Sequence, residues 1–143
     1  MRKSTGMISA LVLGAALSVP AGAAQAAPAA APVSAASLCH SLIVKGNSLN
    51  NKAISASEAR SYKKAGKYNR SARGKLVNAL TACKSAHHAT VLRRIVDAAA
   101  TLIEDAEDLN RKAYVKHDRG AGKGALHNEY DAQRKLHDAI KRS

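Results

Sequence analysis

The chain has 143 residues, carries 23 Lys and Arg against 10 Asp and Glu, and contains neither Phe nor Trp. This length allows one small domain, whose core must be built from Leu, Ile, Val, Ala and a few Tyr. Because the sequence has no G-x-S-x-G, phosphate-loop or dinucleotide-binding motif, enzyme chemistry finds no support. We predict a protein that is not an enzyme and needs no cofactor.

The N-terminal segment 1–26 has the pattern of a cleavable secretory signal peptide. Arg2 and Lys3 form a short positive start, followed by the apolar stretch 7–19. That stretch is too short to cross a bilayer, which takes about 20 residues of helix. The small residues of 24–26 form a cleavage site. We therefore expect export, and a mature protein that is secreted or held in the cell envelope.

The mature chain is expected to begin with an alanine- and proline-rich flexible tether, 27–34, and to continue as a single helical domain, 35–143. No segment of the mature chain approaches transmembrane length. Without Arg2 and Lys3, 21 Lys and Arg remain against 10 Asp and Glu, so this part of the chain is strongly basic. Strong positive charge favours anionic partners.

Two cysteines, Cys39 and Cys83, are predicted to form a disulfide bond. An even number of cysteines in an exported chain favours pairing. The bond would close a loop of about 45 residues and stabilise the fold by about 3–4 kcal/mol in the chain-entropy estimate. Such a link would help a chain that is poor in large apolar residues.

Two helices are predicted before the second cysteine. The first covers about 35–50. The second begins at a capping box in which Ser55 is the N-cap and Glu58 reaches back to it, and it continues to Cys83. If this helix is continuous, the linker 51–57 must be stretched for the cysteines to meet. If it breaks within 66–74, a shorter inner hairpin forms, and the sequence leaves both alternatives open.

Two more helices are predicted in the second half of the chain, over about 89–116 and 125–141, with the glycine-rich segment 118–124 as the turn between them. On the third helix, the buried stripe is expected to consist of Val91, Ile95, Ala99, Leu102, Ala106, Leu109 and Ala113, widened by Leu92, Val96 and Ile103. On the fourth, it is expected to include Leu126, Tyr130, Gln133, Leu136, His137 and Ile140. Short connections predict an all-α, up-and-down bundle of three to four helices.

The segment 60–75 contains seven cations and no acid. On a helix these cations lie opposite the apolar face, which is the usual arrangement for a soluble helix as well as for an anion-binding surface. We predict that they bind anions. The predicted anion-binding residues are Arg60, Lys63, Lys64, Lys67, Arg70, Arg73 and Lys75.

A competing interpretation is that these cations are merely a solvated face, partly neutralised inside the protein. A hairpin that turns at Ala86 would bring four acids of the third helix opposite residues 64–68 of the second. The acids are Glu104, Asp105, Glu107 and Asp108. Exposed ion pairs of this kind contribute only about 0–1 kcal/mol each, but they weaken the field that a partner meets.

A second candidate site consists of two histidines and two tyrosines around the predicted glycine turn. Tyr114 and Tyr130 lie at equal distances from Gly122 along the chain, as do His117 and His127, so a hairpin centred there would gather all four. These side chains can bind haem iron or, for His, divalent metals. No metal-binding motif accompanies them, and the alternative is a polar end of the hairpin.

The sequence thus favours a small, secreted, basic binding protein that associates through charge with an anionic cell-wall polymer or an acidic protein, and with nucleic acid only non-specifically. The first alternative is an exported haem- or metal-binding bundle. The second is a secreted inhibitor or toxin that acts on a protein or a membrane.

Overall fold

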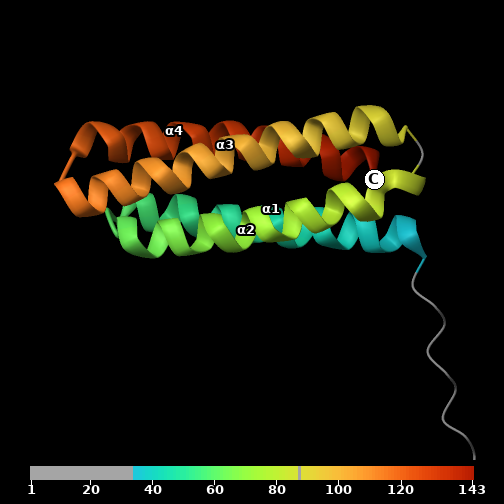
Figure 1. Cartoon of the computed structure of the whole chain (residues 1–143), viewed down its shortest axis with the longest axis horizontal. Helices are drawn as coiled ribbons and strands as arrows, with labels where there is room; N and C mark the ends of the chain where they lie inside the picture. Colours follow the sequence, from blue (N-terminus) through green and yellow to red (C-terminus); the bar gives the residue numbers. More distant parts are fainter. Residues whose placement is uncertain (1–33, 87) are drawn as a thin grey trace, which may run out of the picture. The chain divides into compact units, whose positions relative to one another are not determined.

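The computed structural model describes residues 34–86 and 88–143, which form an all-α bundle (Figure 1). The predicted signal peptide and the tether up to residue 33 lie outside the described residues. The helices are α1 (Ala35–Glu58), α2 (Tyr62–Ala82), the short 3₁₀ helix η1 (Cys83–Ser85), α3 (Ala89–Lys116) and α4 (Arg119–Arg142).

The four long helices alternate in direction, which confirms the predicted up-and-down bundle. α1 packs against α2 and α4, and α3 packs against α2 and α4, so α2 and α4 lie on one diagonal of the bundle (Figure 1). Among the described helices, none combines the length and the apolarity that a membrane span requires.

The core is made of a few aliphatic side chains separated by alanines. The largest fully buried aliphatic residues are Ile43, Leu76, Leu92, Ile103 and Leu136. Small alanine side chains occupy most other core positions, which allows the helix backbones to approach closely. This composition explains how a chain without Phe or Trp forms a packed interior.

The buried faces of α3 and α4 are rotated relative to the prediction. On α3, Leu92 and Val96 are fully buried whereas Val91 is 46% exposed. On α4, Leu136 is buried but His137 is exposed, so the predicted core position of His137 is wrong. On α3 the predicted Ala99, Ala106 and Ala113 are buried, and the face is shifted towards Leu92, Val96 and Ile103. On α4 the buried face is centred about one residue from the predicted one, because the alanines Ala125, Ala132 and Ala139 fill it in place of larger apolar residues.

α1 continues through the point at which it was predicted to end. The predicted end at Asn50 and the capping box of Ser55 and Glu58 are wrong, because all three residues lie within α1. Asn50 is fully buried, and its Nδ2 donates a hydrogen bond to the backbone oxygen of Glu129 on α4 at 2.9 Å. The asparagine therefore serves a contact between helices and not a helix end.

The true end of α1 is a Schellman motif formed without glycine. Arg60 adopts the left-handed conformation with φ of 56°. Its N–H donates to the carbonyl of Ser57 at 2.9 Å, and the N–H of Ser61 donates to the carbonyl of Ala56 at 2.7 Å. These two bonds satisfy carbonyls that the helix end would otherwise leave unpaired.

The greater length of α1 explains how Cys39 and Cys83 meet although α2 is unbroken. Cys39 lies 19 residues before Glu58, and Cys83 lies 21 residues after Tyr62. At about 1.5 Å per residue the two arms have nearly equal lengths, of roughly 28 and 32 Å. The Cys39–Cys83 disulfide is confirmed, with a Cα–Cα distance of 4.9 Å. α2 is continuous, and no stretched linker exists, because 51–57 is helical.

The glycine-rich segment is the first part of α4, and the turn predicted at 118–124 is wrong. The turn is confined to His117 and Asp118, and the Asp118 carboxylate accepts the N–H of Ala121 at 3.0 Å as an N-cap. Gly122 is buried, and a Cβ there would lie 2.5 Å from the ring of Tyr62. This glycine thus makes room for a tyrosine of the neighbouring hairpin.

Candidate functional site

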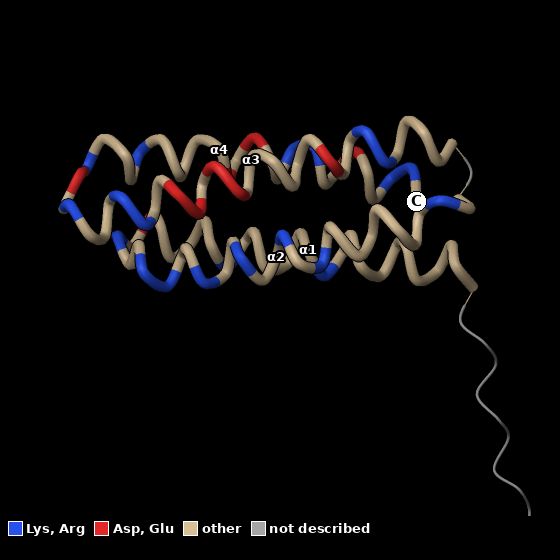
Figure 2. Tube along the Cα trace, viewed as in Figure 1, with Lys and Arg blue, Asp and Glu red and all other residues tan. Residues whose placement is uncertain are grey.

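The positive charge of the bundle is concentrated on the α1–α2 hairpin. Residues 35–82 contain nine Lys and Arg and a single acid, whereas residues 89–142 contain eleven Lys and Arg and nine Asp and Glu. Figure 2 shows Lys and Arg along α2 and towards the end at which α1 meets α2, while most Asp and Glu lie on α3 and α4. The α1–α2 hairpin therefore cannot neutralise its own cations.

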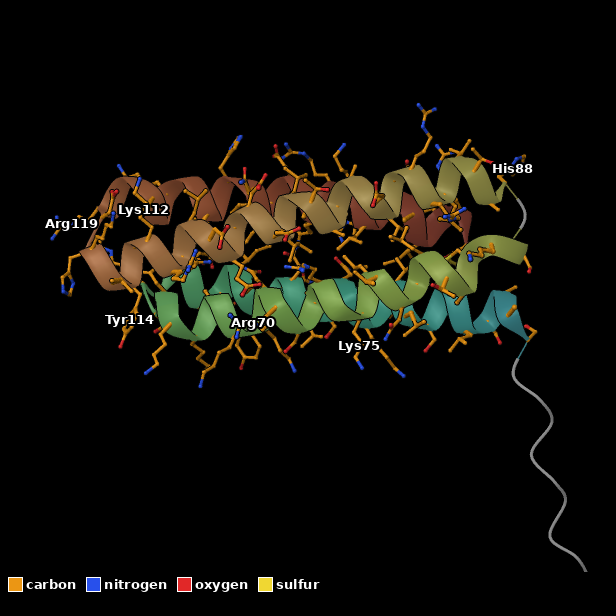
Figure 3. All side chains as sticks on the ribbon, in the orientation of Figure 1. Arg70, Lys75, His88, Lys112, Tyr114 and Arg119 are labelled. Atoms are coloured by element: carbon orange, nitrogen blue, oxygen red, sulfur yellow. A yellow bond between two sulfur atoms is a disulfide. The ribbon has the colours of Figure 1, made fainter. Side chains whose placement is uncertain are left out.

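The predicted anion-binding residues all lie on α2 or on the turn before it. Five of them are exposed and have no carboxylate within ion-pair distance in the part of the chain that the structure describes. These five are Arg60, Lys63, Lys64, Lys67 and Lys75. The first four are close in sequence, and we call them the α2 basic surface; Lys75 lies further along α2 and points away from the bundle (Figure 3).

Two lysines of the α2 basic surface lie over tyrosine rings. Lys63 Nζ is 5.4 Å from the ring centre of Tyr114 on α3, and Lys64 Nζ is 5.9 Å from that of Tyr68 on α2. Such contacts contribute about 0.5–1 kcal/mol at exposed sites. They orient the ammonium groups without neutralising them, because the ring carries no net charge.

The other two arginines of the predicted set are paired with acids of α3. Arg70 Nη2 lies 2.6 Å from Glu107 Oε1, and Arg73 Nη1 lies 2.9 Å from Glu104 Oε1. The predicted register, which placed these acids opposite residues 64–68, is therefore wrong by about five positions. The reason is that the chain between α2 and α3 turns near His88, after η1, and not at Ala86.

This shift in register matters for the charge that a partner would meet. Partial neutralisation of the basic run by α3 does occur, as the competing interpretation required, but it involves the two arginines towards the middle of α2. The α2 basic surface lies closer to the α1–α2 turn than these pairs do, and its cations are left without acidic partners.

Open hollows flank the α2 basic surface. On the α3 side, two adjoining hollows share four lining residues: Tyr62, Lys63, Lys67 and Tyr114. On the α1 side, Lys64 and Tyr68 line a third hollow together with Lys52. Tyr114 is 48% exposed and projects from α3 beside α2 (Figure 3). Cations and aromatic rings therefore alternate along a surface that an extended polymer could follow.

The four residues of the predicted haem or metal site are not brought together. Tyr114 contacts Lys63 of α2, whereas the hydroxyl of Tyr130 donates to Glu58 of α1 at 2.5 Å. His127 lies 3.6 Å from Asp131 on its own helix, and His117 is exposed at the turn. In the described part of the chain, no three His, Cys, Asp or Glu residues are grouped to hold a metal ion.

Sequence reasoning missed a layer of polar side chains inside the bundle. The carboxyl oxygen Oε1 of Glu129 accepts hydrogen bonds from Asn69 Nδ2 at 2.7 Å, Asn110 Nδ2 at 2.8 Å and Ser57 Oγ at 3.0 Å. Glu129 is fully buried, and each of the four long helices contributes to the layer. Burial raises the pKa of Glu129, while the hydrogen bonds from its three neighbours act in the opposite direction.

The signal for this layer is present in the sequence. Asn50, Asn69, Asn110 and Glu129 fall at the three- and four-residue spacing of the buried faces of their helices. One polar residue at a core position of every helix predicts a shared buried network, because a buried polar group needs a partner.

Comparison of this chain with models of known protein families, with curated protein sequences and with solved structures finds no match.

Proposed function

We propose that this protein is an exported, non-catalytic binding protein that associates with phosphate-rich anionic polymers through the α2 basic surface, at the cell envelope or outside the cell. The observation that best supports this proposal is that Arg60, Lys63, Lys64 and Lys67 are exposed, close together and without acidic partners. Of the four acids predicted to face the basic run, Glu107 and Glu104 pair with Arg70 and Arg73, and Asp108 pairs with Arg111 of its own helix.

The surface suits a flexible polymer better than a small molecule. The hollows beside α2 are open to solvent, whereas pockets for small ligands usually enclose most of their ligand. A polymer gains affinity from each phosphate contact, because each contact releases a condensed counterion. Four exposed cations at the start of α2 can contact a repeating phosphate backbone without the fixed geometry that base-specific recognition needs.

The proposal is tested by binding the disulfide-bonded protein to a DNA duplex and to poly(glycerol phosphate) across a salt series. The test variant replaces Arg60, Lys63, Lys64 and Lys67 by Gln. On DNA the slope of log affinity against log salt should become shallower by about 0.9 for each lost contact. Four contacts correspond to about a 150-fold smaller loss of affinity between about 50 and 200 mM salt.

A matched control removes the same number of charges elsewhere: Arg93, Arg94, Lys135 and Lys141 are replaced by Gln. These residues lie on α3 and α4, are exposed, and form no ion pair within the described chain. The control should keep most of the salt dependence of the wild type. Equal losses in both variants would show that net charge alone drives binding, and absence of binding at low salt would show that the α2 cations serve solubility.

A further inference from the structure

The buried layer around Glu129 contains oxygen atoms that no donor of the described chain reaches. Its donors are the Nδ2 groups of Asn50, Asn69 and Asn110 and the hydroxyl of Ser57, each of which donates to an oxygen of Glu129. Each amide also has a second N–H, and none of these reaches the unpaired oxygens of the layer. Three buried atoms of the layer have no partner. All three are oxygens: Asn50 Oδ1, Asn69 Oδ1 and Glu129 Oε2.

Buried polar atoms in native proteins are nearly always paired, because each unpaired group costs about 1–3 kcal/mol. The missing hydrogen could come from a proton on Glu129, from an enclosed water molecule or from a cation that replaces it. These sources differ in the charge that they leave inside the bundle, and the surroundings of Glu129 discriminate between them.

The described surroundings donate hydrogen bonds to the Glu129 carboxyl group but hold no positive charge that would balance an ionised carboxylate. α1, α2 and α3 present the neutral side chains of Ser57, Asn69 and Asn110 to the carboxyl group. In the described chain, no Lys, Arg or His lies within ion-pair distance of it. The charged group that acts on it is Glu58 of α1, whose like charge raises the pKa of Glu129 further. A buried charge without a partner of opposite sign is strongly unfavourable.

A metal ion fits the layer poorly. Two asparagine amides direct their N–H groups at the carboxyl oxygen, and these partial positive charges would face a cation. Calcium takes six to eight oxygen ligands, usually with several carboxylates. Glu129 is the one acid of this layer, so a proton meets the deficit with the least rearrangement.

We propose that the layer is a proton-binding site: Glu129 is a neutral carboxylic acid in the folded protein at neutral pH, and its Oε2, which has no hydrogen-bond partner within the described chain, carries the proton. Folding then takes up one proton from solvent, because the same side chain is ionised in the unfolded chain. No other bond is made or broken.

The proton uptake couples stability to pH in a defined direction. The pKa of Glu129 is raised in the folded state above its ordinary value of 4.5. Its contribution to stability is therefore complete below that value and is lost as the pH rises through the folded-state pKa. Between the two values, the folding equilibrium constant falls by up to tenfold per pH unit.

Glu129→Gln provides the test, since a glutamine amide has the shape and the donor of the protonated acid. We expect the variant to be at least as stable as the wild type at neutral pH, and to lose the pH dependence that Glu129 contributes. The stability of the wild type relative to the variant, from urea unfolding, should fall with rising pH above about 4.5. Glu104→Gln, at an exposed site, is the matched control and should show no such fall.

The opposite slope would overturn the proposal. If Glu129 is ionised in the folded protein, the wild type gains stability over the glutamine variant as the pH rises through the acid range. If the variant fails to fold, infrared spectroscopy of the wild type with isotope-labelled glutamate tests whether Glu129 is protonated. A buried carboxylic acid band at neutral pH supports the proposal, and its absence, with every glutamate ionised, overturns it in favour of an enclosed water or cation.

Discussion

Replacing Gly46 by alanine should destabilise the bundle, although the same change usually favours a helix. Gly46 lies in α1 against α2, and a Cβ added there would be 2.6 Å from Leu76 Cδ2 and 3.0 Å from its Cγ. Carbon atoms pack optimally at about 3.5–4.0 Å, so the overlap is roughly 1 Å. Leu76 is fully buried, so moving it would disturb the residues packed around it.

The size of the effect follows from two opposing contributions. Overpacking of a filled core typically costs about 1–3 kcal/mol. The better helix propensity of alanine returns about 0.8–1.0 kcal/mol. The free energy of unfolding of Gly46→Ala should therefore fall, by up to about 2 kcal/mol.

Gly74→Ala in α2 is the matched control, because a Cβ at that position has no neighbour within 4 Å. This variant should gain about 0.8–1.0 kcal/mol from helix propensity alone. Urea unfolding followed by far-ultraviolet circular dichroism measures both variants, and the difference between them isolates the overlap with Leu76. If Gly46→Ala were as stable as Gly74→Ala, the close approach of α1 and α2 would be refuted.

Three further predictions concern the disulfide, a helix cap and the acids that face α2. Replacing Cys39 and Cys83 by Ala should lower the free energy of unfolding by about 4 kcal/mol, the loop-entropy value for a sequence separation of 44; urea unfolding checks this, and an unchanged midpoint would contradict it. The pKa of Asp118 lies below its usual value of 3.8, chiefly because the carboxylate accepts a backbone N–H at the start of α4. Its stabilisation should be present above that value and lost as the pH falls through the folded-state pKa, so the melting temperatures of Asp118→Ala and wild type should differ at neutral pH and converge in acid. Replacing Glu104 and Glu107 by Gln releases two arginines of α2 and should tighten binding to DNA at low salt; an unchanged affinity would place those arginines outside the contact.

The periodicity of apolar residues predicted a helix correctly where the apolar stripe and the helix end together. The bounds of α3, at Ala89 and Lys116, are confirmed, because a long apolar stripe begins and stops there. The disulfide and the bundle class also follow from counting cysteines and connections. These features depend on local pattern and on chemistry that holds for any exported chain.

The wrong boundaries share a physical cause. Asn50 looked like a helix end and Gly122 looked like a turn because asparagine and glycine usually act locally. In this protein both are buried and serve neighbouring helices: one donates to the backbone of α4, and the other makes room for Tyr62. Contacts between helices override local preference, and a single sequence without its fold does not reveal them.

The candidate site was predictable in part. The cluster of cations on one side of α2 follows from helical spacing. The register between α2 and α3 determines which of those cations pair with acids. A few residues of the turn between the two helices set this register. The layer around Glu129 needed the positions of four helices at once, although each of its members already stood at a core position.

The uneven division of charge between the two helical hairpins gives the molecule an electric dipole, with α2 on its positive side. Near a negatively charged wall or polymer, the resulting torque would turn α2 towards that surface before any contact forms. Because α4 lies diagonally across the bundle from α2, it would then face away. Molecules that arrive in this way would share one orientation and leave the same helix open to solvent and to a second partner.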